Sequence, residues 1–199
     1  MEFTTELTKT PKTKQADESA LGFGRIFTDH MFVMDYEEGK GWHNAKIQPY
    51  APISMYPSTS VLHYGQTIFE GLKAYRCADG SIQLFRVRSN YERMNISAER
   101  LCIPQIDVDF CVKVTEELVK LEKDWVPSAP NTSLYIRPFI ICTDPFLGVS
   151  AGKTYKFIII LSPVGAYYKT GLDPVSIYVE DAYVRACKGG TGYAKTAAN

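Results

Sequence analysis

Gly71-Leu-Lys-Ala-Tyr-Arg-Cys-Ala-Asp-Gly-Ser-Ile-Gln-Leu-Phe85 is the stretch that decides the fold class of this chain. Asp79 and Gly80 lie at its centre, and this dipeptide tolerates the positive φ angles that a tight hairpin turn demands. The flanking residues 71–77 and 81–85 are therefore predicted to be two antiparallel strands. The segments before and after the hairpin indicate what kind of domain contains it.

Two helices are predicted directly after the hairpin. Residues 86–100 form the first, with Ser89 or Asn90 near its start. The second begins after Asp107 or Asp109, because either side chain can cap a helix, and Pro127 ends it. Its apolar residues fall on one helical stripe, and they are Phe110, Val114, Leu118, Leu121 and Trp125.

Strands are predicted on both sides of this helical region. Residues 27–36 and 42–50 precede it, and residues 133–142 and 155–161 follow it. In the segment 133–142, a period of two places Tyr135 and Arg137 on one face and the apolar residues on the other. Strands, then helices, then strands indicate an α+β fold with a mixed or antiparallel sheet.

The chain divides into four segments. Residues 1–20 are rich in Thr, Lys and Glu without periodicity, so we expect a flexible N-terminal arm. Residues 21–162 are the small N-terminal α+β domain, and residues 163–173 are an interdomain linker. Residues 174–199 begin a second domain, with a strand predicted at 175–179.

Composition excludes several classes of function. Lys+Arg and Asp+Glu both total 22, so the net charge of zero argues against a nucleic-acid partner. No apolar run is long enough to predict a membrane span. The five cysteines form no C-x-x-C pair, and the three histidines are dispersed, so we expect no disulfide framework and no metal site. A reduced, cytoplasmic protein is the simplest interpretation.

A glycine-rich stretch precedes Lys195 near the end of the chain. Gly189, Gly190 and Gly192 allow unusual backbone angles and close approach. Lys195 is a phosphate contact, a buried nucleophilic amine or a solvated loop lysine. The stretch also matches the P-loop pattern G-x-x-x-x-G-K-[ST], except that Ala194 replaces the second glycine. A P-loop requires a strand before it and a helix after it.

Two arginines are further candidates for binding. Arg93 lies on the first predicted helix, where it is either solvated, paired with a neighbour or a phosphate clamp. Arg137 is a charged residue in an otherwise apolar strand, so it needs a partner or a cavity. A carboxylate ligand and a structural ion pair both satisfy this need.

Several motifs occur together in a specific order. They are Phe23-Gly-Arg-Ile-Phe-Thr-Asp-His-Met31, Leu62-His-Tyr-Gly-Gln66, Phe69-Glu-Gly71, Leu134-Tyr-Ile-Arg-Pro138, Gly148-Val149, Pro163-Val-Gly-Ala-Tyr167 and Gly189-Gly-Thr-Gly-Tyr-Ala-Lys195. In this order they resemble the branched-chain amino-acid aminotransferases, which are pyridoxal-phosphate enzymes of the D-alanine-aminotransferase-like fold, fold type IV. The resemblance runs from about Leu21 to Asn199.

The resemblance implies a role for individual residues. Lys195 is the catalytic lysine, which binds the cofactor aldehyde covalently and moves the substrate proton. Arg93 holds the cofactor phosphate. Leu147 and Val149 lie on a loop that reaches the partner's site in a homodimer. The substrate-binding residues implied in this way are Phe23, Tyr64, Phe69, Tyr135, Arg137, Leu147 and Val149.

The implied reaction is transamination of leucine, isoleucine and valine with 2-oxoglutarate, as in branched-chain amino-acid biosynthesis. Family members are considerably longer, so we expect this chain to be the N-terminal portion of such an enzyme. It would then contain only the beginning of the cofactor-binding α/β domain, and we expect it to be inactive by itself. Alternatives on the same fold are a D-amino-acid aminotransferase and aminodeoxychorismate lyase. A catalytically silent dimerisation domain and a P-loop nucleotide binder are alternatives from other classes.

Overall fold

The computed structural model describes residues 1–168 and 173–197, and it contains one eight-stranded sheet within them. The strand order is β1-β3-β2-β8-β7-β5-β6, with β4 paired to β7 beside this path. The strands are β1 (Thr4–Thr5), β2 (His30–Glu37), β3 (Gly41–Pro49), β4 (Thr67–Phe69), β5 (Leu72–Arg76), β6 (Ile82–Leu84), β7 (Ser133–Cys142) and β8 (Thr154–Val164). The helices are α1 (Val61–Tyr64), α2 (Val87–Arg100) and α3 (Val108–Leu121), with short 3-10 helices η1 (Glu18–Ala20) and η2 (Lys123–Trp125).

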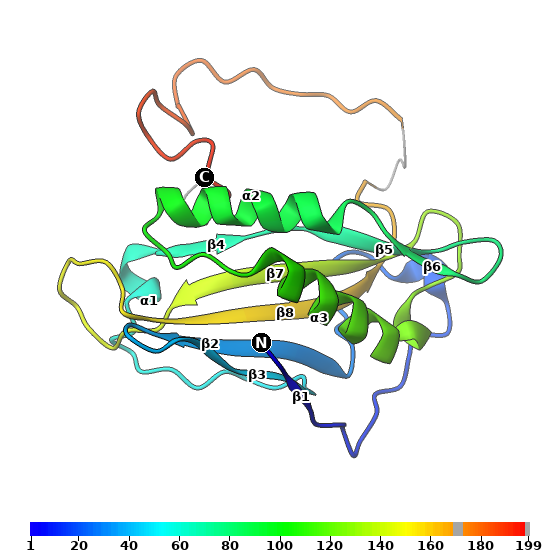
Figure 1. Ribbon diagram of the computed structural model, residues 1–199. Helices are drawn as coiled ribbons and strands as arrows, with labels where there is room; N and C mark the ends of the chain where they lie inside the picture. Colours follow the sequence, from blue (N-terminus) through cyan, green and yellow to red (C-terminus); the bar gives the residue numbers. More distant parts are fainter. Residues whose placement is uncertain (169–172, 198–199) are drawn as a thin grey trace.

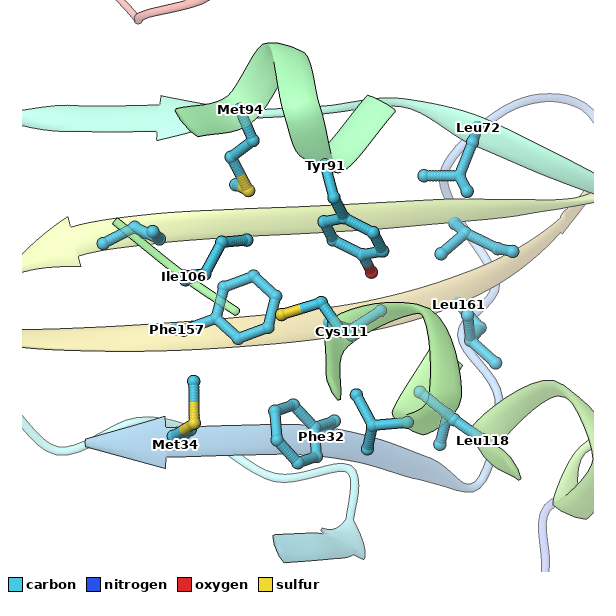
Figure 2. Packing of buried hydrophobic residues seen from close by; sticks show 14 of the residues in the cluster. Phe32, Met34, Leu72, Tyr91, Met94, Ile106, Cys111, Leu118, Phe157 and Leu161 are labelled. Carbon is cyan, nitrogen blue, oxygen red and sulfur yellow. The ribbon is translucent and has the colours of Figure 1, made fainter. Parts of the chain in front are cut away.

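Helices α2 and α3 cover one face of this sheet (Figure 1). Their buried side chains meet those of β2 and β8 in the main core, where Tyr91, Cys111, Phe32 and Phe157 pack together (Figure 2). Burial of such large apolar side chains stabilises a domain by about 1.5–3 kcal/mol each. The pairing is antiparallel everywhere in the described sheet except between β1 and β3. The α+β prediction with a mixed or antiparallel sheet is therefore confirmed.

The predicted hairpin is the β5–β6 pair. Tyr75 lies opposite Gln83, and the side chain of Asp79 accepts a hydrogen bond of 2.9 Å from the backbone of Ser81. Gly80 has a φ of 84°, as the turn requires.

The two predicted helices differ from expectation only at their ends. The side chain of Asp107 caps α3, whereas Asp109 lies in its first turn. Helix α2 begins after Arg86, whose left-handed φ is 52°, and neither Ser89 nor Asn90 caps it. Asn90 lies within the helix and donates to a buried carboxylate instead.

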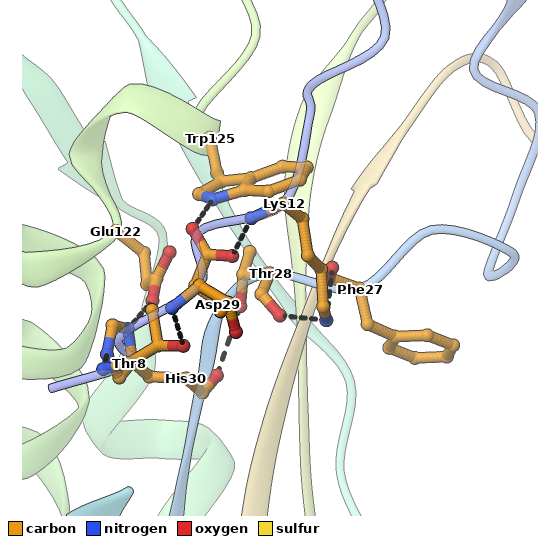
Figure 3. A network of polar contacts seen from close by, with 9 residues as sticks. Thr8, Lys12, Phe27, Thr28, Asp29, His30, Glu122 and Trp125 are labelled. Carbon is orange, nitrogen blue, oxygen red and sulfur yellow. Dashed lines mark hydrogen bonds and ion pairs between the residues drawn. The ribbon is translucent and has the colours of Figure 1, made fainter. Parts of the chain in front are cut away.

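The segment 1–20, expected to be a flexible arm, makes ordered contacts with the domain. Strand β1 pairs with the edge of β3, and the backbone of Thr8 donates to His30 Nε2 over 2.9 Å (Figure 3). Lys12 donates through its backbone to Asp29 Oδ1 over 2.8 Å. The sequence lacked a signal here because single backbone and polar groups make these contacts, and no apolar period accompanies them.

The strand predicted at 175–179 was wrong. No strand occurs between residues 173 and 197, where Ile177, Tyr178 and Val179 are more than four-fifths exposed. A strand is stable only when its backbone pairs with a neighbour, and none of the described residues pairs with this segment. Of the predicted linker 163–173, residues 169–172, including Gly171, lie outside the described residues.

Within residues 1–168 and 173–197, no helix combines the length and the apolar character needed to cross a membrane.

Candidate active site

The lysine segment is held against strand β4 and helix α2. Lys195 accepts a hydrogen bond of 3.0 Å from the backbone of Phe69, and its own N–H donates to Ser97 Oγ over 2.9 Å. Next to it, the hydroxyl of Thr196 donates to the carbonyl of Thr67 over 2.7 Å. Ser97 and Thr196 are both buried. These contacts fix the backbone from which the Lys195 side chain extends.

The glycines before Lys195 form a turn that other residues would disfavour. Gly189 has a φ of 79°, which disfavours other residues, and a Cβ on Gly192 would lie 2.4 Å from that of Ala186. Arg100 Nη2 donates to the carbonyls of Gly189 and Gly190 over 3.2 and 3.3 Å. Among the described residues no strand precedes this turn at 173–188 and no helix follows it up to 197. The local structure therefore does not favour the P-loop alternative.

The amine of Lys195 lies in a pocket of about 240 Å³. Its Nζ is 4.6 Å from the centre of the Phe69 ring, and Arg93 and Arg185 line the same pocket. Lys195 is half-buried. Three cationic side chains and no carboxylate are found among the described lining residues, so the pocket is suited to an anion.

Arg93 is held by the carboxylate of Glu70, a residue for which the sequence suggested no role. Its Nε and Nη2 donate to the two oxygens of Glu70 over 2.6 and 2.7 Å. The Glu70 side chain is fully buried, whereas that of Arg93 is 54% exposed. The hydrogen bonds to Glu70 raise the pKa of Arg93. Within the described residues, Arg93 Nη1 makes no hydrogen bond.

No sequence period singles out Glu70, because β4 has only three residues, but its burial in the structure shows why it needs a partner. Ile68, Glu70 and Leu72 alternate with less buried residues, and all three are buried. A carboxylate at a core-facing position requires a cationic or hydrogen-bonding partner. Arg93 on the following helix is that partner.

Arg137 and Tyr135 lie on one face of β7, as predicted. Arg137 Nε and Nη2 donate to the Tyr135 hydroxyl over 3.2 and 2.7 Å, and the Arg137 guanidinium lies 4.6 Å from the centre of the Phe69 ring. No ion pair to Arg137 occurs within residues 1–168 and 173–197. The structural ion-pair alternative therefore has no support among the described residues, none of which offers the guanidinium a carboxylate partner. Phe23 packs on Tyr135 with ring centres 5.0 Å apart.

Phe69 connects the lysine pocket with the Tyr135–Arg137 pair, because both Lys195 and Arg137 contact its ring. Five of the candidate site residues are joined in this way through direct contacts, and Arg93 shares the pocket of the lysine. These five are Phe23, Phe69, Tyr135, Arg137 and Lys195.

The remaining candidates lie together elsewhere on the surface. The Tyr64 hydroxyl donates to the backbone carbonyl of Leu147, and α1 lies beside the loop between β7 and β8 (Figure 1). Tyr64, Leu147 and Val149 are all exposed. Among the described residues no hydrogen bond, ion pair or ring contact joins these three to Arg137 or Lys195.

Comparison with known proteins identifies close relatives of the sequence, although no family model matches. The chain is 60% identical over 194 residues to branched-chain-amino-acid aminotransferase 2 of Bacillus subtilis, covering 98% of this chain and 53% of the relative. It is 58% identical to branched-chain-amino-acid transaminase 1 of the same organism, covering 94% of this chain and 52% of the relative. A Mycobacterium tuberculosis branched-chain-amino-acid aminotransferase is 49% identical, covering 100% and 55%. The resemblance seen in the motifs is confirmed, and the chain spans about half the length of these relatives.

Solved structures share the fold at low sequence identity. A branched-chain amino acid aminotransferase from Escherichia coli has a TM-score of 0.53 at 23% identity, covering 70% of this chain and 41% of the other. An aminotransferase from Brucella abortus bound to the co-factor PLP has a TM-score of 0.51 at 19% identity, covering 83% and 53%. These similarities show that the α+β arrangement is the one found in such enzymes.

Proposed function

We infer from these relatives that this chain is part of a branched-chain-amino-acid aminotransferase, and we propose that the complete protein transaminates leucine, isoleucine and valine with 2-oxoglutarate. The observation that carries this proposal is the pocket shared by Lys195 and Arg93. A primary amine beside a guanidinium is the pair that an aldehyde carrying a phosphate requires. The names of the relatives do not favour a D-amino-acid aminotransferase or aminodeoxychorismate lyase.

The residues present fit pyridoxal 5'-phosphate. Arg93 and Arg185 offer guanidinium donors to a phosphate, and the Phe69 ring is an apolar wall beside the Lys195 amine. Such a cofactor, when bound, supplies an aldehyde and a ring that accepts electrons from the substrate.

Lys195 has two tasks in this proposal. Its Nζ would hold the cofactor covalently, and the freed amine would move the proton from the Cα of the amino acid. Both roles require that the distance between the amine and the bound substrate stay fixed. The backbone contacts of Lys195 with Ser97 and Phe69 support this by fixing the root of the side chain.

Arg137 and Tyr135 are proposed to bind the side-chain carboxylate of 2-oxoglutarate and glutamate. Arg137 has no acidic partner among the described residues, so it can pair with a carboxylate from the substrate. Phe23 and Phe69 are proposed to contact the aliphatic side chain of leucine, isoleucine or valine, since both rings adjoin the Tyr135–Arg137 pair. One surface thereby serves both substrates.

The Tyr64 hydroxyl is proposed to bind the substrate carboxylate together with Tyr135 and Arg137. Leu147 and Val149 are proposed to reach the substrate site of a partner subunit in a homodimer. Two observations support this: the side chains are exposed, and no contact among the described residues joins them to Lys195. We further propose a cytoplasmic location and a biosynthetic role, because all five cysteines are free thiols and the relatives are bacterial branched-chain aminotransferases.

Borohydride reduction of the complete protein with pyridoxal 5'-phosphate tests the role of Lys195. Mass mapping should find the reduced adduct on Lys195 and no adduct there in Lys195→Ala. An adduct on another lysine in the wild-type protein would contradict the assignment. Kinetics with Arg137→Met test the substrate roles, because KM should rise for 2-oxoglutarate far more than for leucine; equal changes would contradict them.

A further inference from the structure

We propose that Glu70 is a positioning residue for phosphate binding, which fixes the Arg93 guanidinium in the orientation that receives the cofactor phosphate. This inference rests on the proposed function, because it takes Arg93 as the phosphate contact. Glu70 follows β4 and does not itself line the lysine pocket, but it is hydrogen-bonded to Arg93, which does. It therefore acts through Arg93.

Four N–H groups converge on the Glu70 carboxylate. Arg93 donates twice, from Nε and from Nη2. Asn90 Nδ2 donates to Oε2 over 3.0 Å, and the backbone of Gly71 donates to the same oxygen over 3.3 Å. The backbone N–H of Glu70 itself donates to the carbonyl of Pro138 over 2.8 Å. Both oxygens and the backbone beneath them are thus held from several directions.

Only an ionised carboxylate satisfies all four donors. A carboxylate has no N–H or O–H and accepts at both oxygens, whereas an amide presents two donors at one end. A glutamine at this position would turn its NH₂ group either toward Arg93 Nε or toward Arg93 Nη2, Asn90 and Gly71. Each orientation places donor against donor and releases one side of the guanidinium.

The fixed orientation leaves one guanidinium nitrogen for a ligand. With Nε and Nη2 bonded to Glu70, Nη1 is the Arg93 nitrogen without a hydrogen bond among the described residues. Arg93 lines the lysine pocket and also a cavity of about 500 Å³ that includes Tyr135 and Gly71. A planar fork held on one side presents its remaining donors in a fixed direction.

If only the charge of Glu70 mattered, this residue would weaken phosphate binding rather than support it. The carboxylate is negative and lies beside Arg93, so its field opposes the binding of a phosphate. On electrostatic grounds, Glu70→Gln should tighten phosphate binding. On positioning grounds, the same substitution should weaken it, because Arg93 loses its fixed orientation. The sign of the change therefore separates the two accounts.

The experiment compares dissociation constants of pyridoxal 5'-phosphate and pyridoxal for the complete protein. Only the first ligand carries the phosphate, so the ratio of the two constants isolates the phosphate contact from the contacts of the ring. We expect Glu70→Gln to weaken pyridoxal 5'-phosphate on the order of tenfold, the loss of a hydrogen bond to a charged group, and to leave pyridoxal unchanged.

Asp109→Asn is the matched control. Asp109 pairs with Arg88 on the same helix as Arg93, and its side chain is 79% exposed. The substitution removes the same charge from the partner of an arginine that lines neither cavity, so it should change neither constant. A second test is the Arg93→Met background, in which Glu70→Gln should no longer change the ratio.

Each outcome decides a separate question. Unchanged or tighter binding of pyridoxal 5'-phosphate by Glu70→Gln, or equal weakening of both ligands, would overturn the positioning role. If wild-type protein does not prefer the phosphorylated ligand, the proposed function itself fails. Should Glu70→Gln not fold, Asn90→Ala decides, because it removes one donor to Glu70 and keeps the charge. It should weaken only the phosphorylated ligand, by a smaller factor, and an unchanged ratio would overturn the proposal.

Discussion

Replacing Gly71 with alanine should weaken the proposed carboxylate site without replacing any residue that is proposed to bind substrate. A Cβ at this position would lie 2.3 Å from the Tyr135 hydroxyl and 3.0 Å from the ring carbon that bears it. Ordinary van der Waals contact begins near 3.4 Å, so the hydroxyl must move by about 1 Å, since dispersion contacts become repulsive at shorter range. The backbone of Gly71 itself has no left-handed φ and can accept alanine.

The direction of this movement is restricted by Arg137. Its Nη2 is already 2.7 Å from the hydroxyl, so Tyr135 cannot move toward it. Movement away by about 1 Å breaks both hydrogen bonds to the guanidinium, because N–H···O hydrogen bonds have donor–acceptor distances of about 2.7–3.2 Å. The loss of a hydrogen bond to a charged group is worth about 1.5–3 kcal/mol, which corresponds to a change of about tenfold or more.

Steady-state kinetics of the complete protein measure the result. KM for 2-oxoglutarate should rise about tenfold in Gly71→Ala, while KM for leucine changes little. The Tyr135→Phe background is the control, because it lacks the hydroxyl that clashes, and Gly71→Ala should have a much smaller effect there. Equal rises for both substrates, or an undiminished effect in the Tyr135→Phe background, would refute this reasoning.

Three further predictions concern stability and can be checked by chemical denaturation. Ser97→Ala removes a buried acceptor from the lysine segment and should lower the free energy of unfolding by about 1–3 kcal/mol; no loss would contradict the role of that contact. Asp107→Ala removes the cap of α3 and should lower it by about 1 kcal/mol, whereas Asp109→Ala, which caps nothing, should not. Burial alone would raise the pKa of Asp35, but the hydrogen bond and charge of Lys156 outweigh it and hold this pKa below 3.8. Stability from this pair is therefore present above pH 3.8 and lost as the pH falls through the lower folded pKa, and Asp35→Asn should flatten that acid limb; an unchanged limb would contradict the pairing.

The sequence was informative where a long segment had a clear period. The apolar stripe of α3 and the alternation along β7 predicted both elements and placed Tyr135 and Arg137 on one face. Short elements carried no such signal. Helix α1 has four residues and β4 has three, so neither spans enough of its period to be recognised.

The candidate site divides in the same way. Lys195 and Arg93 were identified through motifs, but their shared pocket depends on contacts between residues about 100 apart in sequence, such as Lys195 with Ser97. Glu70 lies in the motif Phe69-Glu-Gly71, but its role could not be predicted from the sequence because its partner Arg93 lies on a different element. At 175–179 a β-rich composition suggested a strand, but the described residues provide no neighbour to pair with it.

The pairing of β1 with β3 has a practical consequence for producing this protein. Thr4 and Thr5 lie along the outer edge of the sheet opposite Lys46 and Ile47, and Glu6 donates to Ile47 over 2.9 Å. Without β1, the edge of β3 would be uncovered, and an uncovered edge can accept a strand from another molecule. Purification tags joined close to Thr4, or proteases that trim the chain up to Thr8, would expose that edge and favour aggregated preparations.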